Sequence, residues 1–320
     1  MKAAVRSRFG SPEVISVEDV EEPSLTPDGI QVRVRAASPN RADWYAMTGR
    51  PYLARITMGL FRPKDPRIGG DFSGTVEAVG GEVTDFRPGD DVFGGKVGAF
   101  AERLVVTRAV VRKPDSLSFE EAATLPTAGV TALQALRDRG GLQPGQKVLI
   151  NGASGGVGIF AIQIAKALGA NVTAVCSTPN TEQALRLGAD KVIDYTKADF
   201  TRSGDRFDLV IDIAGSRRWS DLKRILVPQA RVVIVGAPDE GKFLGPLRHI
   251  LKTRVSSIGS SQTATFFIAK FNQPDFELLG EMTKNGQIRP LIEATYPLSG
   301  IAEAMRHMGS RVRSKIVITM

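Results

Sequence analysis

The sequence is poor in the residues that build disulfides and metal sites. Its 320 residues include a single cysteine, Cys176, and only two histidines. One cysteine excludes an intrachain disulfide, and it equally excludes a zinc site built from several cysteines. Metal-centred chemistry and a disulfide-stabilised secreted scaffold are therefore disfavoured from the start.

Long hydrophobic runs are also missing. No stretch approaches the roughly 18 to 20 consecutive apolar residues that a membrane-spanning helix needs, and the N-terminal MKAAVRSRFG lacks the apolar core of a signal peptide. We therefore expect no membrane span and a cytoplasmic location. Hydrophobic residues make up 42% of the chain, which is enough for two ordinary domains with substantial cores.

Basic residues exceed acidic ones, 42 against 34, and the formal net charge is +8. Lys and Arg are scattered among the acidic residues and form no long run, which disfavours nucleic-acid binding as the main role. A basic solvated surface is the simplest interpretation. A positive field that attracts an anionic cofactor is the alternative.

What the sequence does contain is a strand, a glycine-rich turn and an amphipathic helix in succession, KVLINGASGGVGIFAIQIAKALGA at 147–170. The apolar run at 148–150 is typical of a strand buried on both faces, and apolar residues recur at helical spacing after it. Gly155 and Gly156 lack Cβ atoms, so a phosphate can approach the main chain at the helix N-terminus, whose dipole favours negative charge. Gly158 would let helix and strand pack closely.

The turn reads A-x-G-x-x-G rather than the usual G-x-G-x-x-G, because Ala153 takes the first position. A glycine-rich turn alone is a weak signal, but a place between a strand and a helix is the context that this motif requires. We therefore predict a dinucleotide pyrophosphate site at Ser154, Gly155, Gly156 and Val157. A purely structural turn is the alternative.

The pattern of the sequence changes near Ser118. Before it, from Gln31, short β-rich segments separated by Gly, Pro and Asp turns predict an irregular all-β domain. At the change, Ser118 and Glu121 have the spacing of a helix N-cap and its capping-box partner. After the glycine-rich turn strands and helices alternate, which predicts a parallel sheet covered on both faces, with ligands beyond the carboxyl ends of its strands.

Towards the C-terminus the pattern predicts helices at 276–285 and 301–308 and extended segments at 289–297 and 314–320 that return to the first domain. The apolar RVSSIG segment that begins at Arg254 is interpreted as a strand. The segment 52–61 is apolar for a loop, and it forms either the mouth of a hydrophobic substrate pocket or a small packed helix.

Taken in order, several motifs make the chain resemble the medium-chain dehydrogenase/reductase superfamily, specifically its zinc-free quinone oxidoreductase-like branch. They are MKAAVRSRFGSPEVISVEDV, AASPNRADWYAMTG, GGDFSGTVEAVG with FRPGDDVFG, LPTAGVTALQAL, NGASGGVG, LGADKVIDY and SKIVIT. The resemblance covers essentially the whole chain. It implies an α/β protein with a GroES-like β-rich catalytic domain at 1–122, a Rossmann domain with a doubly wound parallel sheet at 123–268, and a C-terminal segment, 269–320, that returns to the catalytic domain.

Zinc-dependent alcohol dehydrogenases of this superfamily carry metal ligands that this sequence lacks. They have a cysteine in the segment where Asn40 stands and a histidine-glutamate pair near Gly70 and Asp71. His249 and His307 lie outside both segments and are interpreted as surface or packing residues. No metal site is predicted, and without a Lewis acid the reduction of a conjugated acceptor is favoured over the oxidation of simple alcohols.

The resemblance implies hydride transfer from a nicotinamide to a quinone or to the β-carbon of an enone. Donors near the acceptor carbonyl would stabilise charge on its oxygen, and Asn40 and Tyr45 are the candidates because their segment faces the nicotinamide in relatives. The structural alternatives are a turn residue beside Pro39 and a packed aromatic. Asp43 is interpreted as a structural hydrogen-bond acceptor rather than a base.

The cofactor favoured by the sequence is NADPH. NAD-specific proteins usually carry an acid about 20 residues beyond the glycine motif, whereas here the strand NVTAVC ends in Ser177 and Thr178, whose hydroxyls can donate to a phosphate. The Lys or Arg that relatives often carry near Asn180 is absent. Tyr195 matches a tyrosine that contacts the adenosine phosphate in relatives, with an exposed aromatic at a strand end as the alternative.

Further cofactor contacts follow from the resemblance. They are Gly236 and Ala237, where a small residue lets the backbone meet the nicotinamide ribose, Thr131, and Lys315, for which an ordinary solvated lysine is the alternative. Three functions stay open: an NADPH-dependent, zinc-independent reductase of small hydrophobic quinones or α,β-unsaturated carbonyls, a trans-acting enoyl thioester reductase, and a cofactor-binding protein with little turnover. Relatives are commonly dimers through the edge of the Rossmann sheet, so a homodimer is expected.

Overall fold

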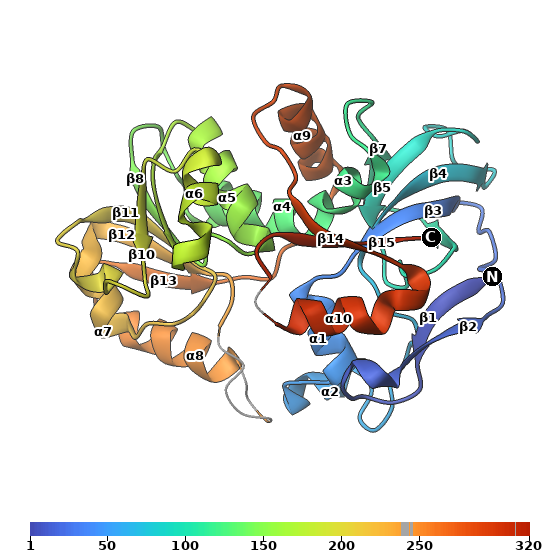
Figure 1. The fold of residues 1–320 in the computed structure, drawn as a ribbon, viewed down its shortest axis with the longest axis horizontal. Helices are drawn as coiled ribbons and strands as arrows, with labels where there is room; N and C mark the ends of the chain where they lie inside the picture. The colour runs from blue at the N-terminus through green and yellow to red at the C-terminus, as the bar shows by residue number, and fades with distance from the viewer. Residues whose placement is uncertain (238–242, 244–245, 311) are drawn as a thin grey trace. The chain divides into compact units, whose positions relative to one another are not determined.

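The computed structural model describes residues 1–237, 243, 246–310 and 312–320 (Figure 1). The chain divides into two compact units. The first unit contains Met1–Val130, Lys270–Gly286 and Pro290–Met320, and the second contains Thr131–Ala269 and Gln287–Arg289. No helix in the described ranges is both long and apolar enough to cross a membrane.

A seven-stranded sheet forms the framework of the first unit. Its strands, in spatial order, are β14 (Ile292–Pro297), β15 (Lys315–Thr319), β3 (Ile30–Ser38), β4 (Asp71–Val79), β5 (Asp91–Gly95) and β7 (Val110–Arg112), and β6 (Arg103–Val106) pairs with β3 outside this order. A hairpin of β1 (Lys2–Arg6) and β2 (Ile15–Asp19) is separate. Because β15 pairs antiparallel with β3, residues more than 280 positions apart in sequence lie side by side, as in the pair Ala37 and Ile318.

The helices of the first unit pack on this framework. They are α1 (Arg41–Thr48), α2 (Arg55–Met58), α3 (Phe119–Ala123), α9 (Gln273–Lys284) and α10 (Ile301–Gly309), while α4 (Leu125–Gln134) spans the division between the units. The capping box predicted at the start of α3 is confirmed: Glu121 N donates to Ser118 Oγ at 3.1 Å, and Ser118 N donates to Glu121 Oε2 at 2.9 Å. The helices and extended segments predicted near the C-terminus are likewise present as α9, α10, β14 and β15.

A six-stranded parallel sheet forms the second unit, as the alternation of strands and helices predicted. Its order is β10 (Lys191–Asp194), β9 (Asn171–Cys176), β8 (Lys147–Asn151), β11 (Phe207–Asp212), β12 (Leu226–Ile234) and β13 (Thr263–Phe266). The helices between its strands are α5 (Gly156–Ala167), α6 (Thr181–Arg186), α7 (Trp219–Leu222) and α8 (Pro246–Ser257) (Figure 1). The strand order reverses between β8 and β11, and ligands of such sheets bind beyond the carboxyl ends of the strands at that point.

One predicted element is wrong. The RVSSIG segment interpreted as a strand lies largely in α8, which continues through Ser257. Ile250 and Thr253, three residues apart, are buried, whereas Leu251, Val255 and Ile258 are exposed. The buried residues have helical spacing, and the exposed apolar residues Val255 and Ile258 made the segment resemble a strand.

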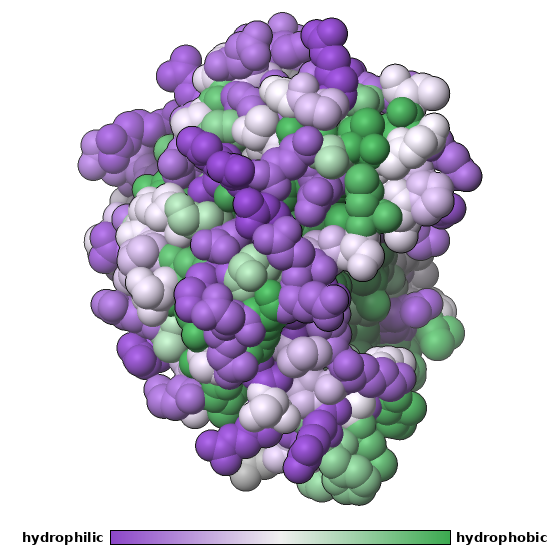
Figure 2. Space-filling view, turned by 90° about the vertical axis from the view of Figure 1, so that its right-hand side faces the viewer, coloured by the Kyte–Doolittle hydropathy of each residue, from purple (hydrophilic) through white to green (hydrophobic). Residues whose placement is uncertain are grey.

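The apolar segment 52–61 forms a short helical turn and α2. The Arg55 guanidinium lies over the rings of Phe9 and Tyr52, 4.6 and 4.4 Å from their centroids, and ties the segment to the rest of the first unit. Its apolar side chains Leu53, Ile56, Leu60 and Phe61 are nevertheless exposed. Figure 2 shows that hydrophobic residues gather in patches on an otherwise largely hydrophilic face of the molecule.

Candidate functional site

The glycine-rich turn joins β8 to α5 in the second unit, so the predicted order of strand, turn and helix is confirmed. Gly152 has a φ of 92°, in the left-handed region that favours glycine. A Cβ on Gly158 would lie 2.3 Å from the carbonyl oxygen of Gly152, so only glycine allows the helix to approach the turn this closely. A Cβ on Gly155 would meet its nearest atom, the same oxygen, at 3.8 Å.

The start of α5 has the chemistry of an anion site. Gly155 is its N-cap, and the first N–H groups of a helix have no partner within the helix and carry the positive end of its dipole. The predicted phosphate contacts Ser154, Gly155, Gly156 and Val157 are all half-buried at this point. Their contact with a dinucleotide stays a prediction.

A buried polar link joins β8 to β11 where the strand order reverses. Asn151 Nδ2 donates to Asp212 Oδ1 at 2.8 Å, and the same oxygen accepts from Gly215 N at 2.9 Å. Asp212 is 1% exposed; burial raises the pKa of its carboxyl, and the two hydrogen bonds oppose that rise. The sequence reasoning missed this pair, although a polar residue ends each of two apolar strands.

An acidic residue lies beside the predicted 2′-phosphate contacts. Thr178 Oγ1 donates to Asp194 Oδ2 at 2.5 Å, because β10 and β9 are parallel neighbours with Asp194 opposite Cys176. Hydrogen bonds from Thr178 and Thr196 lower the pKa of Asp194 to about 2, so it is a carboxylate at neutral pH. No acid follows β9 in the sequence, as stated above, but the pairing of β10 with β9 brings the Asp194 carboxylate beside Thr178.

Ser177 and Tyr195 are the other predicted cofactor contacts at this edge of the sheet. Ser177 Oγ accepts from Asn180 Nδ2 at 3.0 Å, which leaves the hydroxyl hydrogen of Ser177 available to donate. Tyr195, the residue after β10, is 46% exposed. Their roles in cofactor binding stay predictions.

The end of β12 requires a small residue. A Cβ on Gly236 would lie 2.3 Å from the carbonyl oxygen of Ile213, so the backbones of two adjacent strand ends meet there. Ala237 follows directly and is half-buried, and Thr131 is half-buried on α4. The backbone at Gly236 is therefore as open as the predicted approach of a ligand to the main chain requires. Contact with a nicotinamide ribose stays a prediction.

Asn40 lies in a buried polar cluster of the first unit. Its backbone N–H donates to Asp43 Oδ2 at 2.7 Å at the start of α1, so the interpretation of Asp43 as a structural acceptor is confirmed. The Asn40 amide nitrogen donates to Ser38 O at 3.0 Å and to Asp71 Oδ2 at 2.9 Å. Its amide oxygen accepts from Lys315 Nζ at 2.6 Å. Both amide hydrogens of Asn40 are therefore committed.

Asp71, the first residue of β4, anchors this cluster to α4. Thr127 donates to it twice, from N to Oδ2 at 3.0 Å and from Oγ1 to Oδ1 at 2.5 Å. Asp71 is fully buried; burial raises the pKa of its carboxyl, while the positive charge of Lys315 and the hydrogen bonds oppose that rise. In the sequence, Asp71 was named only as a residue near the position of the histidine-glutamate pair of zinc-dependent relatives, and its hydrogen bonds in this cluster were missed.

Lys315 is the cation of the cluster. It is 3% exposed, so the alternative of an ordinary solvated lysine is wrong. Burial lowers the pKa of its ammonium, and the charges of Asp71 and Asp43 raise it. Burial also raises the pKa of Asp43 to about 7, against the positive charges of Lys315 and of the buried Arg6.

Tyr45, one turn after Asn40 on α1, has a freer polar group. Its ring lies 5.6 Å from the guanidinium carbon of Arg41, and its hydroxyl has no hydrogen bond with the part of the chain that the structure describes. The hydroxyl of Tyr45 is therefore available as a donor, whereas Asn40 must break an existing bond to become one.

No metal site accompanies these polar groups. Within the described ranges, no three His, Cys, Asp or Glu side chains come together in a way that could hold a metal ion. His307 Nδ1 lies 3.0 Å from the hydroxyl of Tyr296, and its other nitrogen lies 3.5 Å from Glu293. His249 is half-buried on α8.

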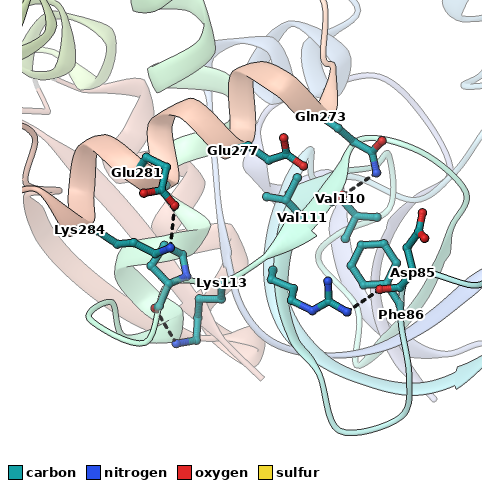
Figure 3. Close-up of a pocket in the computed structure, with 12 residues that line it drawn as sticks. Asp85, Phe86, Val110, Val111, Lys113, Gln273, Glu277, Glu281 and Lys284 are labelled. Atoms are coloured by element: carbon teal, nitrogen blue, oxygen red, sulfur yellow. Dashed lines mark hydrogen bonds and ion pairs between the residues drawn. The ribbon is translucent and has the colours of Figure 1, made fainter.

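A separate groove of about 470 Å³ lies between α9 and β7 in the first unit (Figure 3). Two of its charged side chains have partners within it: Lys284 contacts Glu281 at 2.6 Å, and Arg112 donates to the carbonyl oxygen of Asp85 at 2.5 Å. Gln273 covers the edge of β7 by donating to Val110 O at 3.2 Å. None of the predicted site residues lines this groove.

Two family models match separate stretches of the chain. Residues 26–115 match the alcohol dehydrogenase GroES-like domain, and residues 187–318 match a family described as zinc-binding dehydrogenase. The mitochondrial NAD(P)H oxidoreductase RTN4IP1 of Mus musculus is 33% identical over 100% of this chain and 89% of its own length. The quinone oxidoreductase of Pseudomonas aeruginosa is 31% identical, over 95% and 94%.

Two further similarities bear on fold and function. The trans-enoyl reductase pgmF of Aspergillus terreus is 33% identical over 92% of this chain and 87% of its own. The solved quinone oxidoreductase of Coxiella burnetii superposes with a TM-score of 0.88 at 30% identity and covers 100% of this chain and 99% of its own. The predicted α/β architecture, a GroES-like domain with a parallel Rossmann-type sheet, is confirmed.

Proposed function

Because this chain belongs to the medium-chain dehydrogenase/reductase superfamily, in its quinone oxidoreductase-like branch, we propose that it is an NADPH-dependent, zinc-independent reductase of quinones or α,β-unsaturated carbonyls. The family makes it an oxidoreductase that binds NAD(P)H. The choice of NADPH and the class of acceptor are the proposal. The observation that carries it is a buried cluster: Asn40 and Asp71, from the two segments where zinc-dependent relatives carry metal ligands, hydrogen-bond to each other, and Asn40 accepts from Lys315.

The residues of the second unit fit a dinucleotide. A bound nicotinamide would supply the hydride. The N-terminus of α5 has backbone donors for a pyrophosphate, and Gly155 leaves the space that a phosphate needs. Ser177 has a hydroxyl hydrogen to offer a 2′-phosphate, with Thr178 and Tyr195 beside it. Thr131, Gly236, Ala237 and Lys315 complete the proposed cofactor contacts.

The first unit supplies donors for the acceptor. Hydride addition to a quinone or an enone leaves negative charge on the acceptor oxygen, and fixed donors near that oxygen stabilise it. The hydroxyl of Tyr45 is free to donate, and the amide of Asn40 becomes a donor by releasing Ser38 or Asp71. We assign both residues to acceptor binding.

Steady-state oxidation of NADPH against a panel of quinones, enones and enoyl thioesters tests this function. Turnover with quinones or enones is the expected result. Preference for enoyl thioesters would favour a trans-acting enoyl reductase, the activity in the name of the Aspergillus terreus relative. Tight NADPH binding with no turnover on any acceptor would overturn the proposal in favour of a cofactor-binding protein.

We further propose a homodimer formed through β13, the edge strand of the parallel sheet. An unpaired edge presents free backbone donors and acceptors, and α8, which packs beside β13, carries exposed Leu251 and Val255 and is followed by exposed Ile258. Sedimentation of the Ile258→Glu variant should show a monomer, whereas Leu278→Glu on α9 should leave the assembly unchanged. A cytoplasmic location stays a prediction from the sequence.

A further inference from the structure

We propose that Asp71 is the positioning residue of the acceptor site: its carboxylate orients the Asn40 amide, whose oxygen in turn holds Lys315. The inference rests on the proposed function, because it concerns the same site. Asp71 itself is fully buried and fully hydrogen-bonded, so it acts through its neighbours rather than on a substrate.

The orientation of Asn40 follows from the chemistry of its partners. A carboxylate only accepts hydrogen bonds and an ammonium only donates them. The amide nitrogen of Asn40 must therefore face Asp71, 2.9 Å away, and its oxygen must face Lys315, 2.6 Å away. An asparagine at position 71 could either donate or accept, so only the Ser38 carbonyl and Lys315 would still fix the direction of the Asn40 amide.

Asp71 can impose this orientation because it is held rigidly. Its two oxygens accept from the backbone N–H and the hydroxyl of Thr127 near the start of α4, and its own backbone begins β4. The carboxylate thus connects an element of the sheet to a helix and, through Asn40, to the start of α1. Because Asp71 is held by Thr127 and by its own strand, its carboxylate offers the Asn40 amide a fixed acceptor.

The charge of Lys315 depends on the same carboxylate. Asn40 is its one hydrogen-bond partner in the described part of the chain, so two of its three N–H donors are open to a ligand oxygen. A buried ammonium needs nearby negative charge to stay protonated. The carboxylates whose charges act on it are Asp71 on β4 and Asp43 on α1, and Arg6 on β1 opposes them by its charge near Asp43.

Of the two carboxylates, Asp71 matters more for Lys315. The charge of Asp71 raises the pKa of Lys315 more than that of Asp43 does. Asp43 also has a pKa of about 7, so it is only partly ionised near neutral pH. Replacing Asp71 with asparagine therefore leaves the ammonium with weak support, and Lys315 should release its proton at a lower pH.

The test follows the titration of Lys315 directly, by NMR of the protein with ¹³C at the lysine ε-carbons. The Lys315→Arg variant assigns the signal by removing it. In Asp71→Asn we expect the midpoint to fall by about one pH unit or more, and the alkaline limb of the kcat profile to move in the same direction. Asp275→Asn is the matched control, since Asp275 is a buried carboxylate of the first unit outside this cluster.

The outcomes separate this inference from the proposed function. An unchanged Lys315 midpoint in Asp71→Asn would overturn the inference, even if the wild-type enzyme reduces quinones. A wild-type protein inactive on every acceptor would overturn the function, while the NMR titration would still decide the role of Asp71. If Asp71→Asn does not fold, Asp43→Asn decides: a large fall in the Lys315 midpoint would show that Asp43, not Asp71, holds the charge.

A purely structural role is distinguished by rescue. Asp71→Glu restores the negative charge but lengthens the side chain, so the Lys315 midpoint should return towards the wild-type value. The kcat should remain low, because the longer side chain displaces the Asn40 amide. If Asp71→Glu and Asp71→Asn lower thermal stability equally and have the same Lys315 midpoint, the carboxylate has no role beyond packing.

Discussion

The glycine-rich turn of the second unit and the polar cluster of the first unit use different parts of the chain. The turn offers backbone groups from one continuous stretch and depends on the absence of side chains, as the close approach of Gly158 to Gly152 demonstrates. The cluster depends on side chains from segments far apart in sequence, which hydrogen-bond to one another. The first site should therefore be damaged by adding atoms, and the second by removing charge.

The largest effect should come from adding atoms at Gly158. In Gly158→Val the side chain would collide with the backbone of Gly152 and Ala153, so α5 must move or the unit must loosen, at a cost of roughly 3 kcal/mol or more. Thermal unfolding and NADPH fluorescence titration should both show severe loss. Gly155→Ala is the control, because its Cβ has room: it should keep stability and lose only affinity. Equal stability losses in both variants would contradict the steric account.

The next largest effect should come from removing charge at Lys315. Lys315→Met leaves the buried Asn40 amide oxygen without its donor and removes the positive charge that acts on Asp71 and Asp43, which should cost about 1–3 kcal/mol. Denaturant unfolding at neutral pH measures it. Lys284→Met, which breaks an exposed pair with Glu281, should cost about 1 kcal/mol or less. If the two variants lost similar amounts of stability, the buried lysine would matter no more for folding than the exposed one.

A smaller effect should appear in the pH dependence of stability. The pKa of Asp43 in the folded protein, about 7, lies above that of the unfolded chain, about 3.9. The folded state therefore binds a proton that the unfolded state lacks between these values, and stability falls as pH rises through this window, by at most about 1.4 kcal/mol per unit. Urea unfolding of Asp43→Asn should lack this slope; parallel curves for the two proteins would contradict the assignment.

The smallest effect should be a change of cofactor preference at the edge of the second unit. Asp194→Asn removes the carboxylate beside Thr178, so NADPH should bind several-fold more tightly while NADH changes little. Ser177→Asp should have the opposite effect on NADPH. Titration of both cofactors at two salt concentrations measures the difference, because exposed charges are screened. Tighter NADH binding than NADPH in the unmodified protein would contradict the NADPH assignment.

The sequence was most informative where the structure is local. The strand, turn and helix around Gly155 and the capping box of Ser118 and Glu121 are contiguous, and short-range spacing predicts them. It also predicted the parallel sheet, because strand and helix patterns alternate. The prediction of a strand for the RVSSIG segment was wrong because exposed apolar residues obscured its helical period.

The polar cluster could not be derived in the same way. Asn40 and Lys315 were found through family motifs, but the bond between them joins residues 275 positions apart, and Asp71 lies 31 positions from Asn40. Asp194 meets Thr178 only because β10 pairs with β9 in one register. Contacts of this kind depend on strand pairing, which local spacing does not specify.

The pairing of β15 with β3 sets the order in which the first unit can be completed during synthesis. Residues 131–269, nearly all of the second unit, are made between Asn40 and Lys315. Domains fold largely as units while the chain emerges, so the parallel sheet can form while Asp43 and Asp71 still await their cation. A chain released before residue 315 would contain a complete parallel sheet, but its first unit would lack β15 and the Lys315 cation. Proteases should therefore cleave the first unit of such a chain more readily than the second.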